Sequence, residues 1–448
     1  MTERMKAVAA AGAVAAFWLA VWVFAAALVA QPLILPGPCA VVVALLRLVC
    51  DASTWAILAG SGARILGGLA LAAVCGGVLA GVTVRSRTFS RLVAPALSFV
   101  KATPVACVVV LLLIWLGSAR VSIAAVFLMA LPGVYFSLVE GLTQVDKPLE
   151  QMFRLHGVRG WRLFCAHTWR EVLPFALSCA RAVIGMSWKA GVAAELIGMA
   201  AGTVGERIYQ AKLLIETADL LAWTVLVVAA SWACERVLVW LLRASGPAAW
   251  RAAVQAHGRG SRGRAGGRAA AELALTVGDR APWAPALDGL VLNVPAGGRT
   301  CVMGASGVGK STLLALAAGE CAPCSMVFQD VRLVEDASAL DNVLVCADAR
   351  VDASSAAALL RLLVPGIDAH ARVAELSGGQ RRRVEIARAL LCPGGAVILD
   401  EPFTGLDIAA RDACTEVVLD LLDGRMLLLA THDAADARAL NISDIITL

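Results

Sequence analysis

Long apolar stretches in the first half of the chain restrict its fold more than any other feature. A helix of about 20 apolar residues crosses the roughly 30 Å hydrocarbon core of a bilayer. Six stretches meet this requirement, at about residues 7–30, 62–84, 92–117, 121–143, 172–200 and 218–243. The sequence therefore predicts an all-α domain of six spans in a lipid bilayer over residues 1–245. The first stretch is too long for the apolar core of a signal peptide and is read as an uncleaved span.

Basic residues between these stretches predict the orientation of the spans. With the N-terminus inside, the internal segments hold ten Lys or Arg residues and the external segments hold four. The internal ones are Arg4, Lys6, Arg85, Arg87, Arg91, Lys147, Arg154, Arg159, Arg162 and Arg170, and the external ones are Arg47, Arg120, Arg207 and Lys212. Because cytoplasmic loops are enriched in Lys and Arg, we expect both chain ends in the cytoplasm. The net charge of +5 is explained by these loops, and no nucleic-acid partner is expected.

The remainder of the 448-residue chain has the composition of a soluble domain. Residues 246–270 are rich in Gly, Ala and Arg, which predicts a mobile linker. From residue 271 short β-like runs alternate with helical patterns, at Leu290–Val294, Thr300–Met303, Ala396–Asp400 and Met426–Ala430. This alternation predicts an α/β domain with a mostly parallel sheet over residues 271–448.

A phosphate-binding loop follows the second of these predicted strands. It comprises Gly304, Ala305, Ser306, Gly307, Val308, Gly309, Lys310 and Ser311, with Thr312 after it. Glycines let backbone N–H groups approach phosphate oxygens, and the N-terminus of the helix at Ser311–Ala318 adds positive potential. Lys310 is expected to contact the β- and γ-phosphates of ATP, and the Ser311 hydroxyl to ligate Mg²⁺.

Four further features follow the loop in the sequence. A buried strand ends in Asp400, expected to hold Mg²⁺, and Glu401, expected to polarise the attacking water. Gln329 is expected to reach the metal and this water, and His432 the γ-phosphate and the water. The remaining feature is Leu376-Ser377-Gly378-Gly379-Gln380, which precedes a basic helix at Arg381–Leu391.

With these motifs in this order, residues 271–448 resemble the ATP-binding cassette (ABC) family. The resemblance implies a P-loop ATPase with a helical subdomain, in which Ser377–Gln380 contact ATP held by the opposite subunit. Asp407 matches the loop that joins the two sites. Only 16 residues separate Thr312 from Gln329, about half the family's usual span, and Trp283 is the nearby aromatic available to stack on adenine.

Residues 7–243 resemble the permeases of binding-protein-dependent importers, particularly the nitrate, sulfonate and taurine group. The matching stretches are Leu33–Pro38, Lys101–Pro104 and Ala193–Leu196. In such permeases a cytoplasmic loop presents a short helix to the ATPase, and Leu149–Trp161 with Leu173-Pro174 corresponds to it. Gly157 fits, whereas Gln151–Phe153 replaces the usual Glu-Ala-Ala and the Gly-to-Pro spacing is four residues longer. The alternative is a basic loop without a partner.

Three ionisable residues lie in or near the predicted spans: Lys101, Lys189 and Glu195. Such groups are costly in a membrane and face a partner or a cavity. Either Lys189 pairs with Glu195, or these residues line the passage, where lysines would suit an anionic solute. Among the 13 cysteines, Cys321 and Cys324 form a single CxxC without a second pair, which argues against a metal site there. Cys39 and Cys50 fall in a predicted external segment, where a disulfide between them is allowed but not required by the sequence.

The resemblance implies a homodimer in a bacterial inner membrane, with two ATP–Mg²⁺ and an external binding protein that delivers a small solute. An exporter is the first alternative, but its long intracellular helices are not predicted here. An ATP-driven signalling protein is the second, and it would have fewer spans and a large external domain. Pairing with a different permease–ATPase chain is the third.

Overall fold

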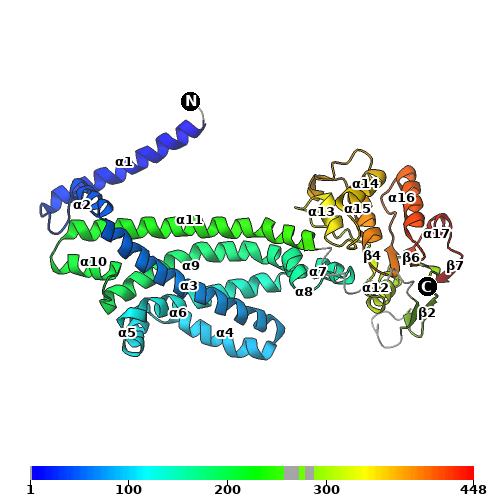
Figure 1. The fold of residues 1–448 in the computed structure, drawn as a ribbon, viewed down its shortest axis with the longest axis horizontal. Coiled ribbons are helices and arrows are strands. Elements are labelled where there is room, and N and C mark those ends of the chain that lie inside the picture. Colours follow the sequence, from blue (N-terminus) through cyan, green and yellow to red (C-terminus); the bar gives the residue numbers. More distant parts are fainter. Residues whose placement is uncertain (1–2, 257–271, 278–286) are drawn as a thin grey trace. The chain divides into compact units, whose positions relative to one another are not determined.

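Apolar helices form the first of two units in the computed structural model, which describes residues 3–256, 272–277 and 287–448 (Figure 1). This unit contains residues 1–144 and 172–245. Its helices are α1 (Glu3–Val29), α2 (Pro38–Cys50), α3 (Ala52–Arg85), α4 (Arg87–Ala102), α5 (Val105–Leu116), α6 (Ser118–Thr143), α9 (Trp169–Gly198), α10 (Val204–Leu213) and α11 (Thr217–Gln255). Helices α9 and α11 continue into the second unit.

The six stretches predicted as spans differ in how well their helices meet the requirements for crossing a membrane. Within the described residues, four helices are long and apolar enough to cross a membrane: α1, α3, α6 and α11. The predicted third span is a pair, α4 and α5, bent by 103°, so the count is up to five. The break lies at Thr103-Pro104, because proline lacks an N–H and disfavours helical geometry in the residue before it. The predicted fifth span lies in α9, a single helix whose Arg181, Lys189 and Glu195 lower its apolar character.

Small residues allow close packing of α3 against its neighbours. A Cβ at Gly68 would lie 2.5 Å from the Ile123 carbonyl oxygen on α6. A Cβ at Gly191 of α9 would lie 2.5 Å from Ile65 Cγ1 on α3. Any larger residue at these positions would force the helices apart, as is typical of helix contacts in membranes.

A buried carboxylate in this unit corrects one expectation. Glu195 is fully buried and accepts hydrogen bonds from Ser61 Oγ at 2.8 Å and from Arg64 Nε at 3.2 Å. The backbone N–H of Gly205 also points to it at 3.4 Å. The cation beside Glu195 is therefore Arg64 of α3 and not Lys189. Arg64 was not among the residues singled out from the sequence.

The second unit contains residues 145–171 and 246–448. Strands β1 (Leu273–Thr276) and β2 (Val291–Val294) form an antiparallel pair. A parallel sheet has the order β4-β5-β6-β3-β7. Its strands are β3 (Arg299–Met303), β4 (Ser325–Val327), β5 (Ala396–Asp400), β6 (Met426–Thr431) and β7 (Asp444–Thr447). The predicted parallel α/β domain is confirmed, and strands β5 and β6 are buried along their whole length because both faces of the sheet are covered.

Helices in this unit flank the sheet and form a separate helical cluster (Figure 1). They are α7 (Lys147–Leu155), α8 (Gly160–Leu163), α12 (Lys310–Glu320), α13 (Ala339–Leu344), α14 (Ala353–Leu363), α15 (Gly378–Leu391), α16 (Ile408–Leu421) and α17 (Ala434–Ala439). A π-helix, Phe164–Thr168, lies between α8 and α9. It falls within the part of the loop where the sequence showed the longer Gly-to-Pro spacing.

The predicted linker begins later than expected. Helix α11 continues to Gln255, and Trp250 and Ala253 are buried with the second unit. Trp250 and Ala253 lie three residues apart, on one face of the helix. The Gly/Arg-rich composition of residues 246–270 obscured this pattern in the sequence. Residues 257–270 of the predicted linker lie outside the described residues.

Candidate nucleotide site and its docking loop

The phosphate loop connects β3 to α12, the context that the sequence predicted. Gly307 has φ +84° and Gly309 has φ +112°, a region of backbone conformation that favours glycine. Lys310 is the first residue of α12, and its Nζ donates to the carbonyl oxygens of Gly304 at 2.8 Å and Ala305 at 3.0 Å. The lysine is thus folded back over the loop, where it can exchange these carbonyls for phosphate oxygens.

One pocket collects most of the predicted phosphate and catalytic residues. Its lining comprises Ser306, Gly307, Gly309, Lys310, Ser311, Thr312, Gln329 and Glu401. Ser311 Oγ lies 3.5 Å from Gln329 Oε1, at the limit of a hydrogen bond. Helix α12 directs its N-terminus toward this pocket, which favours an anion.

Two adjacent carboxylates end strand β5. Asp400 is 3% exposed, and its Oδ1 has no hydrogen-bond partner among the described residues. Burial raises the pKa of Asp400, while the nearby Ser311 hydroxyl acts in the opposite direction. An unpartnered buried carboxylate oxygen beside a hydroxyl and an amide oxygen is a donor set that suits Mg²⁺.

Glu401 occupies a strained backbone position with φ +46°. Its Oε1 lies 3.2 Å from Nδ1 of His432 and 3.9 Å from Nζ of Lys310. The structure therefore brings Glu401, His432 and Lys310 together. His432 follows β6 and remains exposed, so its ring is accessible to a bound nucleotide.

The Ser377–Gln380 segment starts helix α15 away from this pocket. Ser377 is the N-cap, its Oγ accepts from Gln380 N at 3.3 Å, and Gln380 Oε1 accepts from Ser377 N at 2.9 Å. Gly378 and Gly379 complete this exposed turn, and a Cβ at Gly379 would lie 3.5 Å from the Gly405 carbonyl. Asp407 caps α16 by accepting from Ala410 N at 2.7 Å. None of these residues lines the pocket among the residues that the structure describes, and Trp283 lies outside them.

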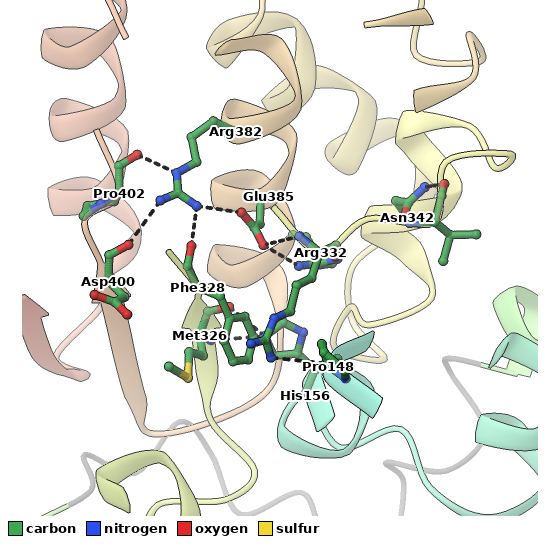
Figure 2. Close-up of polar contacts among 12 residues, drawn as sticks. Pro148, His156, Met326, Phe328, Arg332, Asn342, Arg382, Glu385, Asp400 and Pro402 are labelled. Carbon is green, nitrogen blue, oxygen red and sulfur yellow. Dashed lines mark hydrogen bonds and ion pairs between the residues drawn. The ribbon is translucent and has the colours of Figure 1, made fainter. Parts of the chain in front are cut away.

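Arg382 is a functional candidate that sequence reasoning missed. This residue is 3% exposed and donates to the carbonyl oxygens of Pro402 at 3.2 Å and Asp400 at 3.1 Å (Figure 2). It also donates to the carbonyl oxygen of Glu401 at 2.8 Å. It also contacts the Phe328 carbonyl, next to Gln329, and pairs with Glu385 at 2.9 Å. One guanidinium thus fixes the backbone on both sides of the pocket. The signal in the sequence was an arginine and a glutamate three residues apart on the basic helix.

Helix α7 docks on the ATPase part of the same unit, as the sequence predicted. Met152 and Phe153 are buried in its apolar core. The N–H of Cys324 donates to the Leu155 carbonyl at 3.0 Å, and Nη1 of Arg332 donates to the Pro148 carbonyl at 3.1 Å (Figure 2). The alternative of a loop without a partner is therefore excluded.

The same docking brings α7 close to Gln329. His156 lies against Met326 on β4, with Nε2 at 3.1 Å from both the backbone N and the carbonyl O (Figure 2). The guanidinium of Arg332 lies over the Phe328 ring, 3.6 Å from its centroid, and its Nη1 donates to the Pro148 carbonyl of the loop. These contacts place the loop beside the strand that leads into Gln329.

Comparisons with known proteins cover both parts of the chain. Residues 73–251 match the family described as "Binding-protein-dependent transport system inner membrane component", and residues 320–404 match "ABC transporter". The chain is 38% identical over 182 residues to the taurine import ATP-binding protein TauB of Chromobacterium violaceum, covering 34% of this chain and 68% of that protein. It is 34% identical over 179 residues to the aliphatic sulfonates import ATP-binding protein SsuB 1 of Paracoccus denitrificans, covering 37% and 72%.

A further relative has a similar identity over a similar length. The SsuB 1 protein of Rhizobium johnstonii is 36% identical over 175 residues, and the chain spans 64% of its length. Among solved structures, the dimeric structure of MJ0796, a bacterial ABC transporter cassette, matches 36% of this chain and 86% of its own with 26% identity and a TM-score of 0.33. Since the identities of 34–38% extend over 68–72% of two relatives, the chain belongs to the ATP-binding cassette transporter family.

Proposed function

We propose that this chain is half of an ATP-driven importer, with residues 1–245 as permease domain and residues 271–448 as ATPase domain. Two copies complete two nucleotide sites. The observation that supports this most directly is the convergence of Glu401, His432 and Lys310 on the pocket of the phosphate loop. The relatives are named as import proteins for taurine and aliphatic sulfonates, so an organic sulfonate anion is the proposed solute class.

The residues of the phosphate loop bind and orient the nucleotide in this proposal. Backbone N–H groups of residues 304–312 and Nζ of Lys310 bind the phosphates. Ser311, Gln329 and Asp400 would hold Mg²⁺, which neutralises phosphate charge and orients the β- and γ-phosphates. Trp283 is proposed to stack on adenine.

Hydrolysis is assigned to three side chains around the pocket. Glu401 accepts a proton from the attacking water, Gln329 orients that water, and His432 holds the Glu401 carboxylate and reaches the γ-phosphate. The strained backbone of Glu401 is held by Arg382, so the carboxylate is positioned before nucleotide binds.

The second copy supplies what one chain lacks. Ser377, Gly378, Gly379 and Gln380 form an exposed helix start away from the chain's own pocket, and such a start is suited to the γ-phosphate of ATP held by a partner. Asp407 would join the two sites. A homodimer with both termini in the cytoplasm of a bacterial inner membrane satisfies this requirement.

Import is favoured over export by the loop that carries α7. This loop is short and docks next to Gln329, so a change in the cassette around ATP acts directly on a segment continuous with α6 and α9. An external solute-binding protein is proposed to supply the solute. Export is the second candidate because both domains are fused in one chain, a feature that is also typical of exporters. No contact among the described residues favours export.

Reconstitution in liposomes tests this function. We expect ATP hydrolysis that rises when a sulfonate-loaded binding protein is present on the external side, with uptake of the sulfonate. Glu401→Gln should abolish both. Outward flux without any stimulation by binding proteins would contradict import, and hydrolysis unaffected by Glu401→Gln would contradict the catalytic assignment.

A further inference from the structure

Two cysteines and a histidine form a buried cluster that the nucleotide site does not use. His156 is 1% exposed, Cys346 2% and Cys392 fully buried. One ligand atom from each lies within 4.8 Å of the other two. They come from three segments far apart in the sequence: the end of α7, the segment after α13 and the end of α15.

Backbone contacts hold these three segments in place. The Leu155 carbonyl accepts from Cys324 N at 3.0 Å, just before His156. The Leu391 carbonyl accepts from Asp348 N at 2.9 Å, which joins the segments of Cys346 and Cys392. Main-chain hydrogen bonds therefore join the two cysteine segments to each other and fix the segment of His156 beside Cys324.

The histidine has a free ring nitrogen in this cluster. Nε2 lies 3.1 Å from both the backbone N and the carbonyl oxygen of Met326 (Figure 2), so it accepts from the N–H in one tautomer and donates to the carbonyl in the other. Nδ1 has no hydrogen-bond partner of good geometry among the described residues. When Nε2 donates to this carbonyl, Nδ1 presents a lone pair. A metal-binding histidine typically donates its other N–H to a backbone carbonyl in this way.

The charge around the thiols favours ionised sulfur. Burial by itself raises the pKa of Cys346, but its contacts with Cys392 and His156 and the charge of Arg388 hold that pKa well below the usual value. Burial raises the pKa of Cys392. Arg162 also lies near both thiols, and its Nε donates to the Ala253 carbonyl at 3.2 Å. A cation bound by both sulfurs would displace their protons, so that Cys346 and Cys392 supply two thiolate ligands.

We propose that His156, Cys346 and Cys392 bind one thiophilic d¹⁰ cation, Zn²⁺ or Cu⁺. Thiolate and imidazole ligands select such ions over Mg²⁺ or Ca²⁺. Two thiolates and a neutral imidazole give a neutral cluster with Zn²⁺ and a charge of −1 with Cu⁺, which Arg162 and Arg388 would offset. The bound ion fastens the loop that carries α7 to the ends of α13 and α15, independently of the nucleotide.

Metal stoichiometry of the purified full-length chain tests the site. The protein is incubated separately with Zn²⁺ and, under reducing conditions, with Cu⁺, then desalted, and the retained metal is measured by mass spectrometry. We expect about one retained ion per chain after incubation with either Zn²⁺ or Cu⁺, and the incubation that gives this ratio identifies the ion. Cys346→Ser, Cys392→Ser and His156→Ala should each weaken retention at least about tenfold. Cys414→Ser, which removes a buried thiol of α16 outside the cluster, should retain the ion.

A second measurement keeps the test valid if a variant fails to fold, as judged by loss of ATP binding. Co²⁺ added to the unaltered protein should produce thiolate-to-metal charge-transfer absorption at a ratio of about one ion per chain. Absence of both this absorption and stoichiometric Zn²⁺ or Cu⁺ would overturn the proposal. Retention unchanged in folded Cys346→Ser and Cys392→Ser proteins, or a Cys346–Cys392 disulfide in the freshly purified protein, would overturn it too.

Discussion

Nη2 of Arg382 donates to the carbonyl oxygen of Glu401 at 2.8 Å, and this bond fixes the backbone of the proposed general base. The same guanidinium contacts Phe328, one residue before Gln329, and pairs with Glu385. A buried arginine on the helix that begins with Ser377–Gln380 thereby connects that segment to both sides of the nucleotide pocket. Five predictions follow from this and the related contacts.

Removal of the carboxylate at Glu401 should stop hydrolysis without preventing nucleotide binding. A positioned general base typically contributes about 10²–10⁴-fold to rate, so Glu401→Gln should lower kcat by at least 10²-fold. The measurement is steady-state phosphate release alongside equilibrium ATP binding. Glu416→Gln, at an exposed position of α16, is the matched control and should retain full activity.

Loss of the Arg382 side chain should destabilise the cassette as well as slow hydrolysis. Arg382→Met leaves Glu385 with one guanidinium fewer and frees four carbonyls, and breaking such a buried pair typically costs about 3–5 kcal/mol. Thermal unfolding with and without ATP measures this cost. Arg361→Met, at an exposed position of α14, should leave the melting temperature unchanged. An Arg382→Met protein as stable as its parent would contradict the structural role.

Ionisation of Asp400 should lower the stability of the nucleotide-free protein. Burial raises its pKa in the folded state above the value of the unfolded chain, so its contribution to stability is fully present at low pH and is lost as pH rises through the folded pKa. At neutral pH, Asp400→Asn should therefore raise the melting temperature of the nucleotide-free protein by about 2–4 °C per kcal/mol gained. The same change should remove the Mg²⁺ dependence of ATP binding. A lower melting temperature would refute the expected sign.

Truncation of Phe153 should uncouple transport from hydrolysis. This side chain of α7 is fully buried in the cassette, and Phe→Ala in a core typically costs about 3–5 kcal/mol. We expect solute uptake in liposomes to fall more than ATP hydrolysis does. Arg154→Ala, on the exposed side of the same helix, controls for general effects of altering α7. Equal losses of uptake and hydrolysis would argue against a coupling role.

Glu195 should depend on Arg64 and not on Lys189. Glu195→Ala leaves Ser61 and Arg64 without their acceptor, and loss of hydrogen bonds to a charged group typically costs about 1.5–3 kcal/mol. Lys189→Met should have little effect on unfolding in detergent. The reverse order of the two effects would restore the pairing that the sequence suggested.

The predictable part of this protein is the part encoded over short sequence distances. The phosphate loop, the strand ending in Asp400 and Glu401, and the capped start of α15 each depend on neighbouring residues, because glycine geometry, strand burial and helix capping act locally. The sequence also indicated that the loop before Gly157 docks on the ATPase. The structure moved only the ends of such elements, by three residues at the start of α15 and by one residue at the end of β6.

Partners across long sequence distances were not predictable. One of the two alternatives offered by the sequence was a pair between Glu195 and Lys189, whereas the cation beside Glu195 comes from Arg64 on another helix. The 103° bend between α4 and α5 divides a stretch that the sequence presented as one span. Such outcomes depend on which helix faces pack together, and hydropathy fixes the number of apolar residues but not the direction each side chain faces.

The sequence by itself determined the chemistry available to this protein: apolar helices for a bilayer, and a phosphate loop with carboxylates for a nucleotide. Only the tertiary structure decided which groups meet, such as Arg382 with Glu401 or His156 with Cys346 and Cys392. The physical reason is that a residue's type follows from its own side chain, whereas its neighbours in space follow from the packing of the whole unit.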